Sequence, residues 1–286
     1  MRTTYQEILT KAEMQLKEAG VLEAELDAWY LFQYIFHVSR VNYFLDRMNS
    51  TDVNEEQYNN FFALIKKRAS RIPIQYLTGI QAFMGMEFKV NESVLIPRQD
   101  TEILVEEVLK DCQNRKDLTL LDMCTGSGCI GISLFKLGDF SKAVLADISK
   151  DALAVANENA KKLDAKIILT QSDLFCNIDN EKFDVIVSNP PYIKAEVIET
   201  LEPEVKDCEP RLALEGPENG LFFYEKIARE ALDYLAPGGR LYFEIGHDQG
   251  KDVSNILSKY GYVKIAVLKD LAGLDRVVKA IGGIYV

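Results

Sequence analysis

The sequence predicts an α/β protein in which an all-α helical bundle precedes a doubly wound, mostly parallel sheet of seven strands. From Leu118 onward, short apolar runs alternate with helical patterns, which is the order expected when helices cover both faces of a parallel sheet. Residues 5–70 instead carry helical periodicity and few glycines. With 286 residues, the chain is long enough for one large domain or for two.

Residues 1–78 are predicted to form the helical bundle. Ile8, Ala12 and Leu16 share one face of its first helix, and Gly20 is a natural stop after that helix. A second helix is amphipathic, and its pattern is carried by Leu22, Leu26, Trp29, Tyr30, Gln33 and Phe36. Two consecutive amphipathic helices need a common core, which is why we expect a bundle here.

A third predicted helix is capped at Asn54 and runs to about Arg71. Its end holds a local cluster of basic residues, interpreted as a solvated helix end: Lys66, Lys67, Arg68 and Arg71. The aromatic side chains of the bundle are interpreted as its core and not as a cofactor site: Trp29, Phe32, Phe36, Phe61 and Phe62. The bundle therefore has a core of its own and no cofactor-loop chemistry.

Residues 79–97 are predicted to be a β-hairpin linker, in which segments 82–90 and 93–96 pair around a turn at Asn91-Glu92. The α/β domain is expected to span residues 98–286 and to open with a helix capped by Asp100 or Thr101. The strands predicted for its sheet are 119–123, 143–147, 166–170, 183–188, 240–245, 262–268 and 277–281.

The composition narrows the class of protein. Thirty-three basic residues against 44 acidic ones give a net charge of −11, which disfavours direct nucleic-acid binding through a broad positive face. The 2 histidines exclude a histidine-rich metal site, and no metal is expected. The 5 cysteines form no Cys-x-x-Cys pair and indicate reduced thiols. There is no apolar run of roughly 20 residues and no signal-peptide pattern, so no membrane partner is expected. The cysteines indicate a cytoplasmic protein, and a monomer is expected.

The clearest functional signal lies in residues 183–193. An apolar, β-branched run predicts a buried strand, and Asn189-Pro190-Pro191-Tyr192 ends it because prolines cannot donate backbone hydrogen bonds. Open α/β sheets bind ligands at this carboxyl edge. The Asn189 side-chain oxygen and the Pro190 carbonyl can accept both hydrogens of an NH2 group, while Tyr192 packs beside it. The alternative is a turn after a core strand, but a turn needs no such combination.

Three further loops predict a nucleoside-containing ligand. Small residues after the first strand let the backbone approach a ligand closely: Cys124, Thr125, Gly126, Ser127 and Gly128. Asp147 ends the next strand, where a carboxylate can accept from both ribose hydroxyls. After the third strand, Asp173 can accept from an adenine amino group and Leu174 can flank the ring. Neither the dinucleotide glycine pattern nor a P-loop lysine is present.

Further motifs lie between these loops and at both ends of the chain: PIQYLTG (73–79), LIPR (95–98), EPRLAL (209–214), FEIG (243–246) with Gln249, and DLAGLDR (270–276). The loops together resemble those of class I S-adenosylmethionine-dependent methyltransferases with a Rossmann-like sheet. Among these, Asn-Pro-Pro-Tyr marks enzymes that methylate amide or exocyclic amino nitrogens. Over essentially its whole length, the chain resembles the protein-(glutamine-N5) methyltransferases of peptide chain release factors, the HemK/PrmC family.

The resemblance implies S-adenosylmethionine as cofactor, with S-adenosylhomocysteine as product. It implies that the glutamine of a release factor's Gly-Gly-Gln motif enters the Asn189-Pro190-Pro191-Tyr192 pocket, with Asn189 also beside the cofactor. Residues 1–78 would then recognise the protein substrate. No histidine or lysine lies in the motif, so no general base is assigned. Arg98 and Glu102 are candidates near the site by resemblance only.

The sequence departs from the family pattern at a few positions. Cys124 stands where the loop usually opens with glycine, Gln99-Asp100 replaces a common Pro-Glu, and Leu174 stands where some members carry an aromatic ring. Three other functions remain open at this point. They are an adenine-N6 methyltransferase acting on DNA or RNA, a non-catalytic adenosyl-binding or assembly protein, and a related enzyme acting on a ribosomal-protein glutamine.

Overall fold

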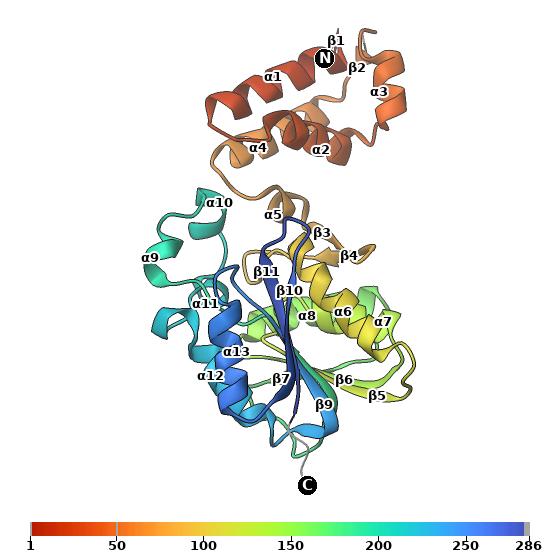
Figure 1. Cartoon of the computed structure of the whole chain (residues 1–286). Coiled ribbons are helices and arrows are strands. Elements are labelled where there is room, and N and C mark those ends of the chain that lie inside the picture. Colours follow the sequence, from red (N-terminus) through yellow and green to blue (C-terminus); the bar gives the residue numbers. More distant parts are fainter. Residues whose placement is uncertain (1, 50, 283–286) are drawn as a thin grey trace. The chain divides into compact units, whose positions relative to one another are not determined.

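The structure, a computed structural model, describes residues 2–49 and 51–282 (Figure 1). The chain divides into two compact units. The helical unit contains the residues up to Gly79 together with Glu202–Cys208, and the sheet unit contains Ile80–Leu201 and the residues from Glu209 onward. A short segment in the second half of the chain thus belongs to the helical unit, which the sequence did not predict.

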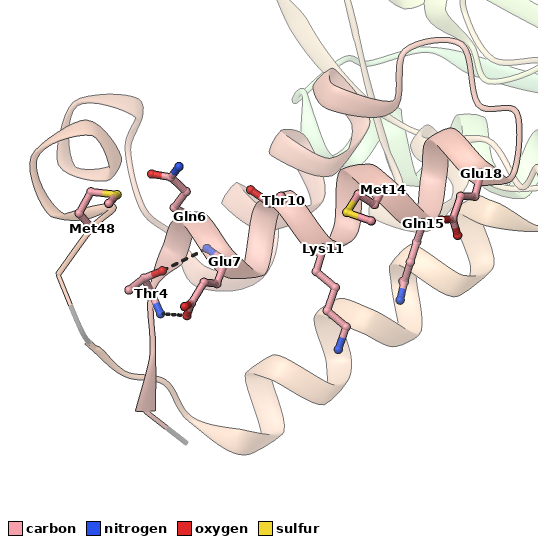
Figure 2. Close-up of a pocket in the computed structure, with 9 residues that line it drawn as sticks. All are labelled: Thr4, Gln6, Glu7, Thr10, Lys11, Met14, Gln15, Glu18 and Met48. Carbon is pink, nitrogen blue, oxygen red and sulfur yellow. Dashed lines mark hydrogen bonds between the residues drawn. The ribbon is translucent and has the colours of Figure 1, made fainter.

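The helical unit is built from α1 (Tyr5–Glu18), α2 (Ala24–Phe36), α3 (Arg40–Asp46), α4 (Glu55–Ala69), α5 (Ile74–Thr78) and α10 (Pro203–Lys206), with a short antiparallel pair, β1 (Arg2–Thr3) and β2 (Thr51–Asp52). Helix α1 begins with a capping box, in which Thr4 Oγ1 accepts from the Glu7 N–H and Glu7 Oε2 accepts from the Thr4 N–H (Figure 2). The buried core includes Trp29, Phe32 and Phe61, as predicted, while Phe36 and Phe62 pack partly buried against it.

The predicted buried face of α2 is only partly right: Trp29 is buried, but other residues of the predicted pattern are exposed. Leu22 is 83% exposed, and Leu26 and Tyr30 are exposed as well. The buried face instead carries Ala24, Ala28, Leu31 and Phe32, together with Trp29. Helix α2 has apolar residues on two faces, so its periodicity did not decide which face packs; the alanine-containing face is the one that meets α1 and α4.

The basic cluster is only partly a solvated helix end. Lys66 and Lys67 are exposed, but Arg68 is 7% exposed and lies between two carboxylates. Its Nε is 2.7 Å from Asp27 Oδ2, and its Nη2 is 2.8 Å from Glu204 Oε1. Arg71 also binds Glu204, with 2.6 Å between Nη2 and Oε2. Because the partner in α10 is distant in sequence, local patterns could not reveal this ion-pair cluster.

In the described part of the sheet unit, the main sheet has 7 strands in the order β10-β11-β9-β8-β5-β6-β7. These strands are β5 (Leu118–Met123), β6 (Phe140–Asp147), β7 (Ile168–Gln171), β8 (Phe183–Ser188), β9 (Leu235–Glu244), β10 (Val263–Lys269) and β11 (Asp275–Ile281). Neighbours from β9 to β7 are parallel, and β11 is antiparallel to both of its neighbours. The predicted doubly wound, mostly parallel sheet is confirmed, and every predicted strand overlaps an observed one.

Helices cover both faces of this sheet (Figure 1). One buried cluster includes residues of α6 (Glu102–Cys112), α7 (Cys129–Leu137) and α8 (Lys150–Lys162), and the other includes α12 (Phe222–Ala231) and α13 (Gly250–Lys259). Shorter elements near the strand ends are η1 (Gln99–Thr101), α9 (Ala195–Ile198), α11 (Arg211–Leu214) and η2 (Glu218–Gly220). None of the helices in the described residues is both long and apolar enough to cross a membrane.

The predicted hairpin is shifted along the chain. Strands β3 (Ile80–Phe83) and β4 (Met86–Lys89) turn at Met84-Gly85 and not at Asn91-Glu92. Both turn residues have positive φ, at +50° and +72°, the backbone of a tight hairpin turn in which glycine is favoured. The Asn91 side chain instead accepts a hydrogen bond from the Ser93 N–H at 2.9 Å within a loop.

Candidate active site

A cavity of about 340 Å³ opens at the carboxyl end of the parallel strands. Its walls include residues at or just after the ends of β5, β6, β7 and β8, the edge where open α/β sheets bind ligands. The predicted site residues that line it are Cys124, Thr125, Gly126, Ser127, Asp147, Asp173, Leu174, Asn189 and Pro191. The other predicted site residues, Gly128, Pro190 and Tyr192, do not line it. Both predicted groups, the nucleoside loops and the Asn-Pro-Pro-Tyr loop, therefore meet in one cavity.

The loop after β5 is held by two carboxylates. Asp122 Oδ2 accepts from Thr125 Oγ1 at 2.6 Å and from the Gly131 N–H at 2.9 Å. Burial raises the pKa of Asp122 to about 7, against the opposing effect of these hydrogen bonds. Asp147 Oδ2 accepts from the Gly126 N–H at 2.8 Å. Sequence analysis missed Asp122, although a charged residue inside an apolar strand before a glycine loop was a usable signal.

The loop keeps its tight turn in spite of Cys124. Cys124 has φ +63°, close to the +56° of Gly126, so it takes a left-handed conformation that glycine adopts more readily. That conformation costs a non-glycine residue roughly 1–2 kcal/mol. Gly128, with φ +82°, has a packing role, because a Cβ there would lie 2.8 Å from Ile132 Cδ1 and 3.2 Å from Ala156 Cβ. It brings α7 close to α8 behind the loop.

The remaining nucleoside residues fit an adenosyl ligand. The Asp147 oxygens each accept one backbone N–H, from Gly126 and from Ser149, which leaves lone pairs for ribose hydroxyls. Asp173 is exposed at the cavity, while Leu174 is 5% exposed and offers an apolar surface. The cavity volume lies within the range of about 300–1,000 Å³ usual for cofactor sites. The described residues thus fit the cofactor that the resemblance implies.

The Asn-Pro-Pro-Tyr backbone is clamped on both sides. Ser188 Oγ donates to the Met123 carbonyl at 2.7 Å, and the Ile193 N–H donates to the Leu214 carbonyl at 2.9 Å. Gln249 Nε2 donates to the Tyr192 carbonyl at 3.3 Å. These bonds tie the loop to β5, α11 and the start of α13, so its geometry is set by three separate elements.

Two glycines that sequence analysis missed pack directly on this loop. A Cβ at Gly216 would lie 2.7 Å from the Pro191 carbonyl oxygen, and one at Gly220 would lie 2.1 Å from the Tyr192 carbonyl oxygen. The segment Glu215–Gly220 contained a turn signal, Gly-Pro followed by Asn-Gly, but nothing local showed what the turn would contact.

Behind the loop lies a buried carboxylate, Glu244, at the end of β9. It is 2% exposed, and burial raises its pKa to about 7. The nearby side chains of Thr101 and Asn189 oppose this rise in the pKa, and Tyr192 Oη lies 3.5 Å from Glu244 Oε1. The pKa of Tyr192 is raised by burial and by the Glu244 charge. The Tyr192 side chain therefore points toward the Glu244 carboxylate and does not line the cavity.

The two candidates taken from resemblance alone have different positions. Arg98 Nη2 is 2.6 Å from Oε1 of the buried Glu209, and their chain neighbours Pro97 and Pro210 both line the cavity. Glu102 does not line the cavity, and its Oε1 accepts from the Met84 N–H at 2.6 Å. Arg98 thus braces the cavity wall, and Glu102 supports the hairpin turn.

A second, open cavity of about 600 Å³ lies along α1 in the helical unit (Figure 2). It is lined by Thr4, Gln6, Glu7, Thr10, Lys11, Met14, Gln15, Glu18 and Met48. None of the predicted site residues is among them, and the Thr4–Glu7 pair is already used in the helix cap.

Comparisons with known proteins identify the family models and relatives that this chain is similar to. Residues 7–79 match the family model of the PrmC N-terminal domain, and residues 98–216 match that of the methyltransferase small domain. A release factor glutamine methyltransferase of Clostridium botulinum is 41% identical over 269 residues, covering 93% of this chain and 94% of that protein. Its counterpart in Clostridium acetobutylicum is 40% identical, covering 96% and 97%.

A solved structure supports the fold. The crystal structure of a methyltransferase from Pyrococcus furiosus matches with a TM-score of 0.57, covering 77% of this chain and 100% of that one. At 18% sequence identity this likeness concerns the fold alone.

Proposed function

The chain belongs to the family of release factor glutamine methyltransferases, and we propose that it methylates the side-chain amide nitrogen (N5) of the glutamine in the Gly-Gly-Gln motif of a peptide chain release factor. The methyl donor in this proposal is S-adenosylmethionine. One observation carries the proposal: Asn189 and Pro191 line the same cavity as the loop Cys124–Ser127 and Asp147. A nitrogen pocket and a nucleoside site within one cavity are what a nitrogen methyltransferase needs.

The cofactor would be held by the residues that already fit it. The loop around Gly126 would approach it with backbone groups, Asp147 would accept from its ribose hydroxyls, and Leu174 would offer its adenine an apolar surface beside Asp173. When bound, S-adenosylmethionine supplies an electrophilic methyl group on a positively charged sulfur. Asn189 lines the cavity as well, so its amide can lie between donor and substrate.

The Asn189 and Pro190 oxygens would make the substrate nitrogen a better nucleophile. An amide nitrogen is a poor nucleophile because its lone pair is delocalised into the carbonyl. When both of its N–H groups donate to the Asn189 side-chain oxygen and the Pro190 carbonyl, electron density moves toward nitrogen and the lone pair is aimed. Positioning and electrostatics then supply most of the rate enhancement. We assign no general base, because the extra proton can be lost after transfer.

The helical bundle of residues 1–78 would recognise the release factor, with residues 79–97 as hairpin linker and 98–286 as the methyltransferase domain. Support comes from its exposed apolar side chains, since large apolar patches mark interaction surfaces. One group of exposed side chains begins just before α2 and continues along it: Leu22, Leu26, Tyr30 and Tyr34. A second group lies on α3 and just after it: Val41, Phe44, Leu45 and Met48.

This division of labour has a direct test. Leu26→Ser combined with Tyr30→Ser should raise KM for an intact release factor at least about tenfold, which corresponds to about 1.4 kcal/mol. The same variant should leave turnover of a short Gly-Gly-Gln peptide and cofactor affinity unchanged. Leu137→Ser, at an exposed apolar position of the sheet unit, is the matched control. An unchanged KM for the intact protein in the α2 variant would contradict the assignment.

The proposed reaction is tested by incubating the protein with isotopically labelled S-adenosylmethionine and a release factor and mapping the label by mass spectrometry. We expect one methyl group on the Gly-Gly-Gln glutamine and none on a release factor in which that glutamine is replaced by glutamate. DNA, RNA and ribosomal protein are the competing substrates in parallel reactions. Label in one of these and none in the release factor would overturn the proposal.

A further inference from the structure

Glu244 sits beside Asn189 because of strand register. In the parallel pair of β8 and β9, Ser188 lies opposite Phe243, the last partners of that ladder. The next residues along the two strands are Asn189 and Glu244, so their side chains leave the sheet side by side and on the same face. Burial then removes water as a partner, and Glu244 Oε2 has no hydrogen-bond partner among the described residues.

An Asn amide is ambiguous as a substrate anchor. One end carries an oxygen that only accepts hydrogen bonds, and the other carries an NH2 group that only donates. Only the oxygen can accept from the NH2 group of a glutamine; the reverse orientation sets two donors against each other. A neighbouring group must therefore stabilise the orientation in which the Asn189 oxygen faces the substrate.

An ionised carboxylate can stabilise that orientation, because it accepts hydrogen bonds from the amide NH2 group and cannot donate to the amide oxygen. The side chains of Thr101 and Asn189 both oppose the rise in the pKa of Glu244, as nearby hydrogen-bond donors do. With its NH2 group directed to Glu244, Asn189 presents its oxygen on the opposite side. Glu244 Oε2, which has no hydrogen-bond partner among the described residues, is free to accept from this NH2 group.

We propose that the Glu244 carboxylate is a positioning residue that orients the Asn189 amide, so that the amide oxygen faces the substrate nitrogen. The inference rests on the proposed function, in which Asn189 accepts from the substrate. It adds a residue outside the cavity lining, at the end of a different strand, on which the geometry of the Asn-Pro-Pro-Tyr pocket depends.

Orientation by Glu244 has a pH dependence. A protonated Glu244 has an O–H that can donate to the Asn189 oxygen, which favours the reversed and inactive amide. The charged and titratable groups that face Glu244 come from the surrounding elements: Asp100, Cys129, Tyr192, Tyr224 and Arg276. Burial raises the pKa of Tyr192, Tyr224 and Cys129. The pKa of Arg276 is also raised, because the effect of nearby acidic groups outweighs that of its burial. These four side chains therefore keep their protons between pH 6 and 8.

The test is the pH profile of single-turnover methyl transfer at saturating cofactor and substrate. For the wild-type protein we expect the rate constant to fall about tenfold per pH unit below the Glu244 transition near pH 7. Glu244→Gln keeps the shape but can donate as well as accept, so it should lower the rate about tenfold and flatten this acidic limb. Asp122→Asn is the control, because Asp122 is the other buried carboxylate with a pKa of about 7; its acidic limb should remain.

A double-mutant cycle separates orientation of Asn189 from a general structural role. In an Asn189→Ala background there is no amide to orient, so adding Glu244→Gln should cost no further rate. Additive losses, a wild-type pH profile in Glu244→Gln, or loss of cofactor binding in that variant would each overturn the inference. Failure of the proposed function looks different, because the wild-type protein would then not label the release factor at all.

Discussion

Gly220→Ala probes how the Asn-Pro-Pro-Tyr loop is held, and the structure offers a matched control. At Gly220, φ is +81° and a Cβ would lie 2.1 Å from the Tyr192 carbonyl oxygen and 2.7 Å from Gln249 Nε2. Gly261 has nearly the same backbone, at φ +84°, but no described atom within 4 Å of an added Cβ. Both alanine variants pay for the left-handed conformation, and only the first pushes on the loop.

The magnitudes follow from these contacts. The shared backbone cost is roughly 1–2 kcal/mol. At Gly220 the Tyr192 carbonyl must also move by roughly 1 Å to reach ordinary contact. That movement disrupts the bonds from Gln249 Nε2 to the Tyr192 and Gly220 carbonyls, at about 1 kcal/mol each. We therefore expect Gly220→Ala to be less stable than Gly261→Ala by about 2 kcal/mol.

Activity should separate the two variants further. Two prolines before Tyr192 have fixed φ angles and cannot absorb the displacement locally, so it reaches the Asn189 and Pro190 oxygens. A misplacement of about 1 Å can cost about 100-fold in rate. Single-turnover methyl transfer to a release factor and cofactor titration are the assays: Gly220→Ala should lose about 100-fold in rate with its cofactor affinity kept, and Gly261→Ala should lose neither. Equal rates in the two variants would refute this account of the clamp.

Asp147→Ala should weaken S-adenosylmethionine binding by roughly 1–3 kcal/mol in calorimetry, because the Gly126 N–H and the ribose lose their acceptor, while the exposed Asp151→Ala should bind normally. Arg68→Ala leaves Asp27 buried without its ion-pair partner and should destabilise the helical unit by about 3–5 kcal/mol in denaturant unfolding; Lys66→Ala, at an exposed site, should stay within about 0.5 kcal/mol of wild type. Burial raises the pKa of Glu244 from 4.5 to about 7, so its protonated form favours the folded state: this stability is fully present below pH 4.5 and is lost as pH rises through about 7. Glu244→Gln should therefore unfold at a higher temperature than wild type at pH 8, by a stability difference of up to about 3 kcal/mol, and with little difference at pH 4.5, whereas a lower melting temperature at pH 8 would contradict the raised pKa.

The parts of the fold with strong local signals were predictable. Alternating apolar runs and helical patterns identified the strands, and Phe183–Ser188 was predicted with its exact bounds because prolines end it. The hairpin was misplaced because Asn91-Glu92 resembles a turn, while the actual turn uses Met84 in a conformation that methionine rarely adopts. The face of α2 was partly misassigned, with Trp29 right and Leu26 and Tyr30 wrong, because the helix is apolar on two faces and only contact with α1 and α4 selects one.

The site was predictable wherever the chemistry lies in the loop itself. Asp147, Asp173 and Asn189 all lie at or just after strand ends, so parallel order alone brings them to one edge. What escaped were the residues that act through tertiary contact. Glu244 acts by its register beside Asn189, and Gly220 acts by its closeness to the Tyr192 carbonyl. Both contacts join residues that are far apart in the sequence, so the periodicity and spacing of residues could not predict them.

The central claim, that Asn189 holds the substrate amide and does not merely end a strand, is tested most directly with Asn189→Asp. Aspartate is among the best substitutes in a turn, so a purely structural Asn189 would leave methyl transfer unchanged. In the proposed pocket, the added negative charge stabilises the cationic cofactor in the ground state more than in the transition state. Single-turnover transfer to a release factor should then fall at least about tenfold, a barrier increase of about 1.4 kcal/mol, with cofactor affinity kept or improved. A wild-type transfer rate in Asn189→Asp would contradict the account.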